Sequence, residues 1–108
     1  MFLVLDNTDI IECVDFRQHV TFNNGTVEER ATFSLDNKLY TRENVDMLKK
    51  YFKKGDGKIY NLSLKNEKNG EVTRSFDCNG FISIEWVAPE NSRFGEPYFM
   101  VSAQELIF

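Results

Sequence analysis

The dipeptide Asn24-Gly25, placed between two runs of alternating apolar and polar residues, constrains the fold of this chain more than any other feature. Both residues accept the positive φ angles of a type I′ turn, so they predict a β-hairpin with a two-residue loop. Such a loop fixes the register, with Phe22 opposite Val27 and Phe16 opposite Phe33. The ribbon then has one apolar face and one polar face, and the apolar face needs a cover.

The segment 42–54 predicts an amphipathic helix that would provide this cover. Thr41 is a suitable N-cap, and Gly55 can adopt the left-handed conformation that ends a helix. At about 100° per residue, apolar side chains gather on one side of the helix and lysines on the other. The apolar side consists of Val45, Met47, Leu48, Tyr51 and Phe52.

A second hairpin is predicted after the helix, because Tyr60, Leu62 and Leu64 alternate with polar residues and a second alternating run follows. A three-residue loop at 68–70, with Gly70 in the left-handed conformation, would bring the two apolar faces together. Asn79-Gly80 predicts a break in the chain after this hairpin. Other strands are expected at 2–5, at 10–22 with a bend, at 82–86 and from Tyr98 onward.

These patterns predict an α+β fold for residues 1–108 as a single domain. Its antiparallel hairpins would supply about six or seven strands, arranged as a sandwich or partial barrel, with the helix at about 42–54 packed on the sheet. The aromatic share of 14% favours a packed core. Cys13 and Cys78 lie in separate predicted strands, and buried free thiols are the simpler expectation than a metal site or a disulfide.

The charge balance argues against two classes of partner. The net charge is −4 and charges of both signs are interspersed, so neither nucleic acid nor an anionic membrane is an expected partner. No run is long and apolar enough to span a bilayer, and the first residues do not have the pattern of a signal peptide. We therefore expect a cytoplasmic protein.

A catalytic or metal-binding constellation is not apparent. The single histidine, His19, falls on the polar face of the first hairpin opposite Arg30, where a surface imidazole is the simplest interpretation. One histidine and two separated cysteines do not make a zinc site. Gly55 and Gly57 follow the helix, so they do not form a phosphate-binding loop at its N-terminus. We expect no cofactor, no metal and no enzymatic activity.

Two surface features are candidates for an interaction site. Lys49, Lys50 and Lys53 form a local basic face on an acidic protein, which could hold an acidic partner or could be a solvated helix face. The loop 88–97 is bounded by both prolines of the chain and carries Arg93, Phe94 and Glu96. Phe94 could contact a partner or could anchor the loop.

The leading hypothesis is a non-enzymatic interaction or assembly domain, which acts through a sheet edge or through the loop 88–97. Its partner would be a protein, including a second copy of this chain as a homo-oligomer. Virion and mobile-element proteins include small β-rich structural or adaptor domains of this layout, which is an analogy of fold only. The alternatives are a small-ligand carrier with a pocket lined by Phe16, Phe33, Phe52 and Trp86, and a hydrolase with a pair of carboxylates.

Overall fold

A computed structural model describes residues 1–105 and confirms the α+β fold. Seven antiparallel strands form one sheet in the order β2-β1-β5-β6-β7-β4-β3, so β2 and β3 are its two edges. The strands are β1 (Phe2–Leu5), β2 (Asp9–Glu12), β3 (Asp15–Asn23), β4 (Thr26–Asp36), β5 (Tyr60–Lys65), β6 (Val72–Val87) and β7 (Tyr98–Glu105). The helical elements are η1 (Asn37–Leu39), α1 (Arg42–Lys49) and η2 (Pro89–Asn91).

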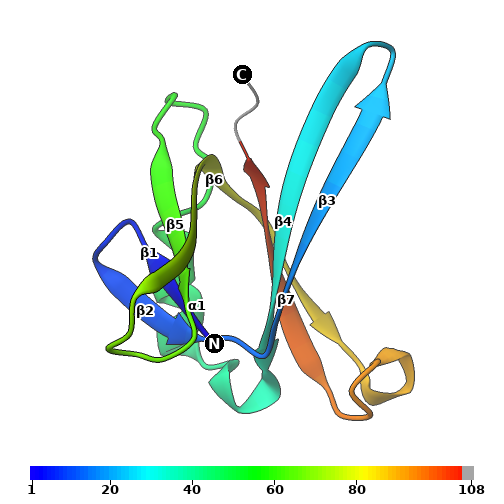
Figure 1. The fold of residues 1–108 in the computed structure, drawn as a ribbon. Helices are drawn as coiled ribbons and strands as arrows, with labels where there is room; N and C mark the ends of the chain where they lie inside the picture. The colour runs from blue at the N-terminus through cyan, green and yellow to red at the C-terminus, as the bar shows by residue number, and fades with distance from the viewer. Residues whose placement is uncertain (106–108) are drawn as a thin grey trace.

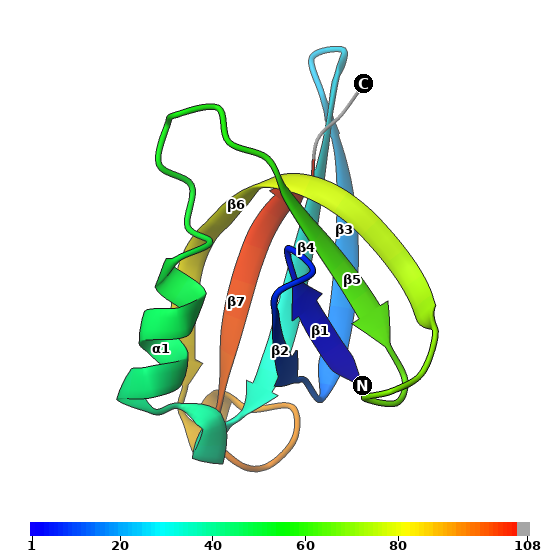
Figure 2. The same ribbon diagram turned by 90° about the vertical axis from the view of Figure 1, so that its left-hand side faces the viewer.

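Strand β6 holds the two halves of the sheet together. Its first part pairs with β5 and its second part with β7, and the register shifts near Phe81 and Ser83. Figures 1 and 2 show β6 arching between a half formed by β1, β2 and β5 and a half formed by β3, β4 and β7. The predicted break at Asn79-Gly80 is therefore a bend within one strand of 16 residues.

The first hairpin has the predicted register. Phe22 faces Val27, Phe16 faces Phe33, and the loop residues Asn24 and Gly25 have φ angles of 50° and 80°. The long alternating run at 10–22 is divided, because β2 ends at Glu12 and β3 begins at Asp15. The expected bend in this run is thus a complete interruption, and it places β2 and β3 at opposite edges of the sheet.

The second hairpin also has the predicted pairing, with Tyr60 opposite Cys78 and Leu62 opposite Phe76. Its loop differs from the prediction. Gly70 does not have a positive φ angle, and the strands separate after Lys65 pairs with Val72. A bulge between Leu64 and Lys65 keeps the register, so the apolar faces meet without the predicted three-residue loop.

Helix α1 begins as predicted but is shorter at its C-terminal end. The Thr41 hydroxyl accepts a hydrogen bond from the Asn44 amide at 3.2 Å. The helix ends at Lys49 because the backbone around Phe52 pairs with Phe81 of β6 instead of continuing the helix. Within residues 1–105, no helix is long and apolar enough to cross a membrane.

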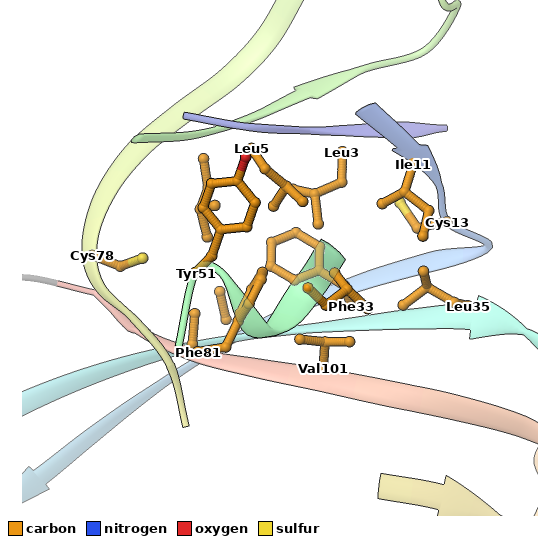
Figure 3. Close-up of a cluster of buried hydrophobic side chains, with 14 of the residues drawn as sticks. Leu3, Leu5, Ile11, Cys13, Phe33, Leu35, Tyr51, Cys78, Phe81 and Val101 are labelled. Atoms are coloured by element: carbon orange, nitrogen blue, oxygen red, sulfur yellow. The ribbon is translucent and has the colours of Figure 1, made fainter. Parts of the chain in front are cut away.

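The core lies inside the curled sheet and under α1 (Figure 3). Leu48 of the helix is fully buried, and Phe33 meets Phe81 with ring centroids 6.4 Å apart. Cys13 and Cys78 are buried in this core, and neither forms a disulfide within residues 1–105. Burial raises the pKa of the Cys13 thiol to about 11. Other members include Leu3, Leu5, Ile11, Leu35, Tyr51, Leu62, Phe99 and Val101.

Candidate functional site

The end of the β3–β4 hairpin projects from the rest of the sheet (Figure 1). As far as Glu105, the last described residue, strand β7 pairs with β4 from Asp36 to Glu29. Within the described residues, the end of the hairpin therefore consists of two strands without a third neighbour. We call residues 20–28 the hairpin tip, which also includes Val20, opposite Glu29, the last β4 residue that pairs with β7 within residues 1–105. A two-stranded ribbon is marginally stable in water, so a partner strand would stabilise this tip.

Two apolar side chains of the hairpin tip are exposed. Val20 has 47% and Phe22 has 78% of its surface exposed to solvent, although both lie on the same face of β3 as Phe16. Phe16 itself packs against Phe33, with ring centroids 5.2 Å apart. The expectation that α1 covers the whole apolar face of the hairpin is thus wrong at the tip. Only the base of the hairpin contributes to the core, and the tip extends beyond it.

The outer edge of β3 is the longer of the two sheet edges. Strand β3 has nine residues, whereas β2 at the opposite edge has only four and carries Asp9 and Glu12. Short strands and charged side chains are common protection against edge pairing. Between Gln18 and Asn23, β3 contains no lysine, no proline and no register shift. This edge therefore lacks the usual protection.

The loop 88–97 is held against the base of the hairpin by Arg93. The Arg93 guanidinium donates hydrogen bonds to the Asp15 carboxylate and, at 3.1 Å, to the Ser34 hydroxyl. It also lies 4.8 Å from the centroid of the Phe94 ring. Arg93, which the sequence suggests as an interaction residue, thus has a structural contact at this position.

Phe94 and Glu96 lie at a shallow surface hollow of about 170 Å³, with Val14 and Pro97 among its lining residues. The Phe94 ring meets Tyr98 edge to face at 4.9 Å, yet 45% of Phe94 stays exposed. The two interpretations of Phe94, as an anchor and as a contact point, are therefore compatible. An interaction through this loop stays a prediction.

The three lysines of the predicted basic face are exposed, but they do not share one element. Lys49 ends α1 and Lys50 caps it, whereas Lys53 lies in the segment whose backbone pairs with β6. Lys50 Nζ lies 3.9 Å from Asp9 Oδ2, and the Tyr51 hydroxyl donates a hydrogen bond to the same carboxylate. Burial, assisted by this hydrogen bond, raises the pKa of Tyr51.

A polar groove of about 470 Å³ lies on the outer face of the sheet, over β3, β4, β6 and β7. His19, Arg30, Glu28 and Glu85 are among its lining residues, and all four are exposed. The groove does contain two carboxylates, as the hydrolase hypothesis requires. Exposed carboxylates keep their hydration, however, and a general acid usually needs a desolvated site.

The residues expected to line a ligand pocket are divided between the core and the surface. Phe16, Phe33 and Phe52 pack in or against the core, whereas Trp86 is 50% exposed and donates a hydrogen bond to Asn37 Oδ1 at 2.8 Å. Among residues 1–105, no cluster of three or more metal-ligating side chains is present.

Comparisons with family models, with curated proteins and with solved structures found no match to this chain. The candidate site therefore depends on the geometry alone. Val20 and Phe22 are the candidates that sequence analysis missed, because it assigned them to the covered face. The polar residues Gln18 and Glu29 on that same face were the available signal, since they mark where the core ends.

Proposed function

We propose that this protein is a non-enzymatic interaction domain that binds a protein partner by adding a strand to the outer edge of β3 at the hairpin tip. The observation that carries the proposal is the exposure of Val20 and Phe22 on an unprotected edge strand. In this mode of binding, backbone hydrogen bonds provide affinity and side-chain contacts provide specificity.

Two observations favour the hairpin tip over the loop 88–97 as the site where a partner strand is added. Its exposed apolar side chains belong to an edge strand, so a bound strand would both complete the hydrogen bonding and cover Phe22. At the loop 88–97, by contrast, Arg93 is already used in contacts with Asp15 and Ser34. The tip is therefore the better site for a partner.

A pair of matched variants tests the proposal. Val20 and Val72 are strand valines with exposed fractions of 47% and 50%, but only Val20 lies at the tip. We expect proteins captured from a native lysate by the immobilised wild-type chain to be lost with Val20→Lys and retained with Val72→Lys. Capture of the same proteins by Val20→Lys would refute the role of the tip.

A further inference from the structure

We infer that the partner of the hairpin tip is a second copy of this chain, which pairs antiparallel with the first through β3. This inference rests on the proposed function, because it names the partner of the same edge. Val20 of each copy would lie opposite Phe22 of the other, and Thr21 would face Thr21 across a two-fold axis. The interface would be a continuous sheet through both hairpins.

The direction of the backbone groups limits the possible registers. A two-residue loop is closed by a hydrogen-bonded pair, here Asn23 with Thr26, and such pairs recur at every second residue. Thr21 therefore directs its amide and carbonyl toward β4, whereas Val20 and Phe22 direct theirs toward the outer edge. Strand pairing between copies must then place outward-directed residues opposite each other.

Side-chain complementarity selects one of these registers. With Val20 opposite Phe22, both exposed apolar side chains gain an exposed apolar neighbour. A register shifted by two residues pairs Val20 with Val20 but places Phe22 opposite Gln18, and a shift in the other direction pairs Phe22 with Phe22 but places Val20 opposite Asn24 of the turn. Cross-strand pairs between aromatic and β-branched residues are favourable, so the first register is preferred.

The rest of the tip agrees with this arrangement on both faces. Val27 lies beside Phe22 in the same hairpin, so each copy adds a third apolar residue to the covered strip. On the opposite face, His19 would lie opposite Asn23, and no two like charges would face each other between the β3 strands. Charge repulsion therefore does not oppose the pairing.

The projection of the hairpin makes room for a second copy. Antiparallel pairing of residues 18–24 places the two protein bodies at opposite ends of the joined hairpins, because each hairpin extends beyond its own sheet (Figure 1). Interfaces below about 1,200 Å² are usually weak, and one short edge pairing falls in this class. We therefore expect a reversible dimer that dissociates on dilution.

Sedimentation equilibrium over a concentration series tests the dimer. We expect the wild-type chain and Val72→Lys to associate with the same dissociation constant and Val20→Lys to associate at least about tenfold more weakly, because its ammonium group would face Phe22 of the second copy. Circular dichroism on each variant confirms that the fold is retained.

Cysteine cross-linking tests the register. In the proposed dimer, Thr21→Cys would place the thiol of one copy opposite the thiol of the other. Residue 21 of one copy and residue 21 of the other form a pair without mutual backbone hydrogen bonds, and the Cα separation of about 4.5 Å at such a pair suits a disulfide. His19→Cys, on the same face, would place its thiols too far apart and is the matched control. Cys13 and Cys78 are 2% and 0% exposed, so we expect little background in the wild-type chain. Under mild oxidation, Thr21→Cys should form a covalent dimer much faster than His19→Cys.

Three results would overturn the inference. The first is a wild-type chain that stays monomeric at the highest concentration. The second is equal cross-linking of Thr21→Cys and His19→Cys. The third is dimerisation only after removal of residues 106–108, which would identify that segment as the occupant of the tip. Capture of a different protein that depends on Val20, by a monomeric chain, would leave the proposed function intact and refute only the second copy.

Discussion

Gly80 lies where β6 bends, and the backbone after α1 crosses directly beside it. Its φ angle is +109°, and a Cβ atom at this position would lie 2.6 Å from Tyr51 O and 2.8 Å from Lys53 N. The close approach lets Phe81 N donate to Tyr51 O at 2.7 Å and lets Lys53 N donate to Phe81 O at 2.9 Å. One glycine therefore permits both the bend and the docking of this segment.

We predict that Gly80→Ala lowers the free energy of unfolding by about 3 kcal/mol or more, because the added methyl group is both strained and overpacked. Gly55→Ala is the control. Gly55 also has a positive φ angle, +72°, but nothing lies within 4 Å of its Cβ position. We expect this change to cost about 1 kcal/mol. Equal losses in urea unfolding would contradict the close packing at Gly80.

The buried thiol of Cys13 predicts a loss of stability at alkaline pH. A cysteine thiol ordinarily has a pKa of 9.0, whereas burial raises the pKa of Cys13 to about 11 in the folded protein. Since the folded state holds the proton more tightly, the stabilisation is complete below pH 9 and is lost between pH 9 and 11. The raised pKa of Tyr51 acts in the same direction from pH 10.0 upward.

Urea unfolding at several pH values measures this effect. We expect the free energy of unfolding of the wild-type chain to fall more steeply between pH 9 and 11 than that of Cys13→Ala. Only the slopes are compared, because removal of the thiol also leaves a small cavity. Equal slopes for the wild-type chain and Cys13→Ala would show that the pKa of Cys13 is not higher in the folded state than in the unfolded state.

At the scale of elements, Arg93 determines how the loop 88–97 docks on the hairpin base. We predict that Arg93→Ala speeds amide hydrogen exchange in this loop while the melting temperature changes little. The contact is worth about 1 kcal/mol, since both Arg93 and Asp15 are about one-third exposed. Arg17→Ala is the control, because Arg17 also pairs with Asp15, at 3.4 Å, without touching the loop. Slow exchange in Arg93→Ala would mean that other contacts hold the loop.

Local sequence patterns predicted the two hairpins well, because the alternation of side chains and the position of a turn fix register over short distances. The end of α1 and the continuity of β6 could not be predicted in this way. The first depends on the pairing of the Phe52 backbone with Phe81, and the second on the pairing of β6 with both β5 and β7. Tyr51 and Phe52 continue the helical spacing of apolar residues and so suggest a longer helix. Backbone pairing of this segment with β6 overrides that local tendency.

At the scale of the whole molecule, the hairpin tip is separate from the core. We predict that deletion of Thr21, Phe22, Val27 and Glu28 shifts the melting temperature only slightly, because within residues 1–105 these residues pair only with each other. The deletion removes two residues from each strand and so keeps the register. In contrast, Phe33→Ala should cost about 3–5 kcal/mol, because Phe33 is fully buried.

Thermal unfolding of both variants, followed by circular dichroism, distinguishes these cases. A large loss of stability after the deletion would show that the tip supports the core, which would weaken its assignment as an interaction surface. A small loss would show that the tip is not needed for folding.

The candidate site was less predictable than the fold. Sequence analysis identified the apolar face of the first hairpin, but it could not determine how far the core extends beneath that face. This limit depends on distant parts of the sheet, such as Phe76 of β6, which packs against Phe16 and Phe33 at the hairpin base. Packing by a strand distant in the sequence thus covers Phe16, whereas Val20 and Phe22 stay exposed.

The position of β7 between β4 and β6 also has a consequence for how this chain acquires its structure. Each hairpin can form from local contacts, but the β3–β4 hairpin has no sheet neighbour until β7 is synthesised. A nascent chain that ends before Tyr98 would therefore carry the β3–β4 ribbon, with its apolar face exposed, apart from the sheet of β1, β2, β5 and β6. During translation, such a chain would be more prone to aggregation than the finished protein.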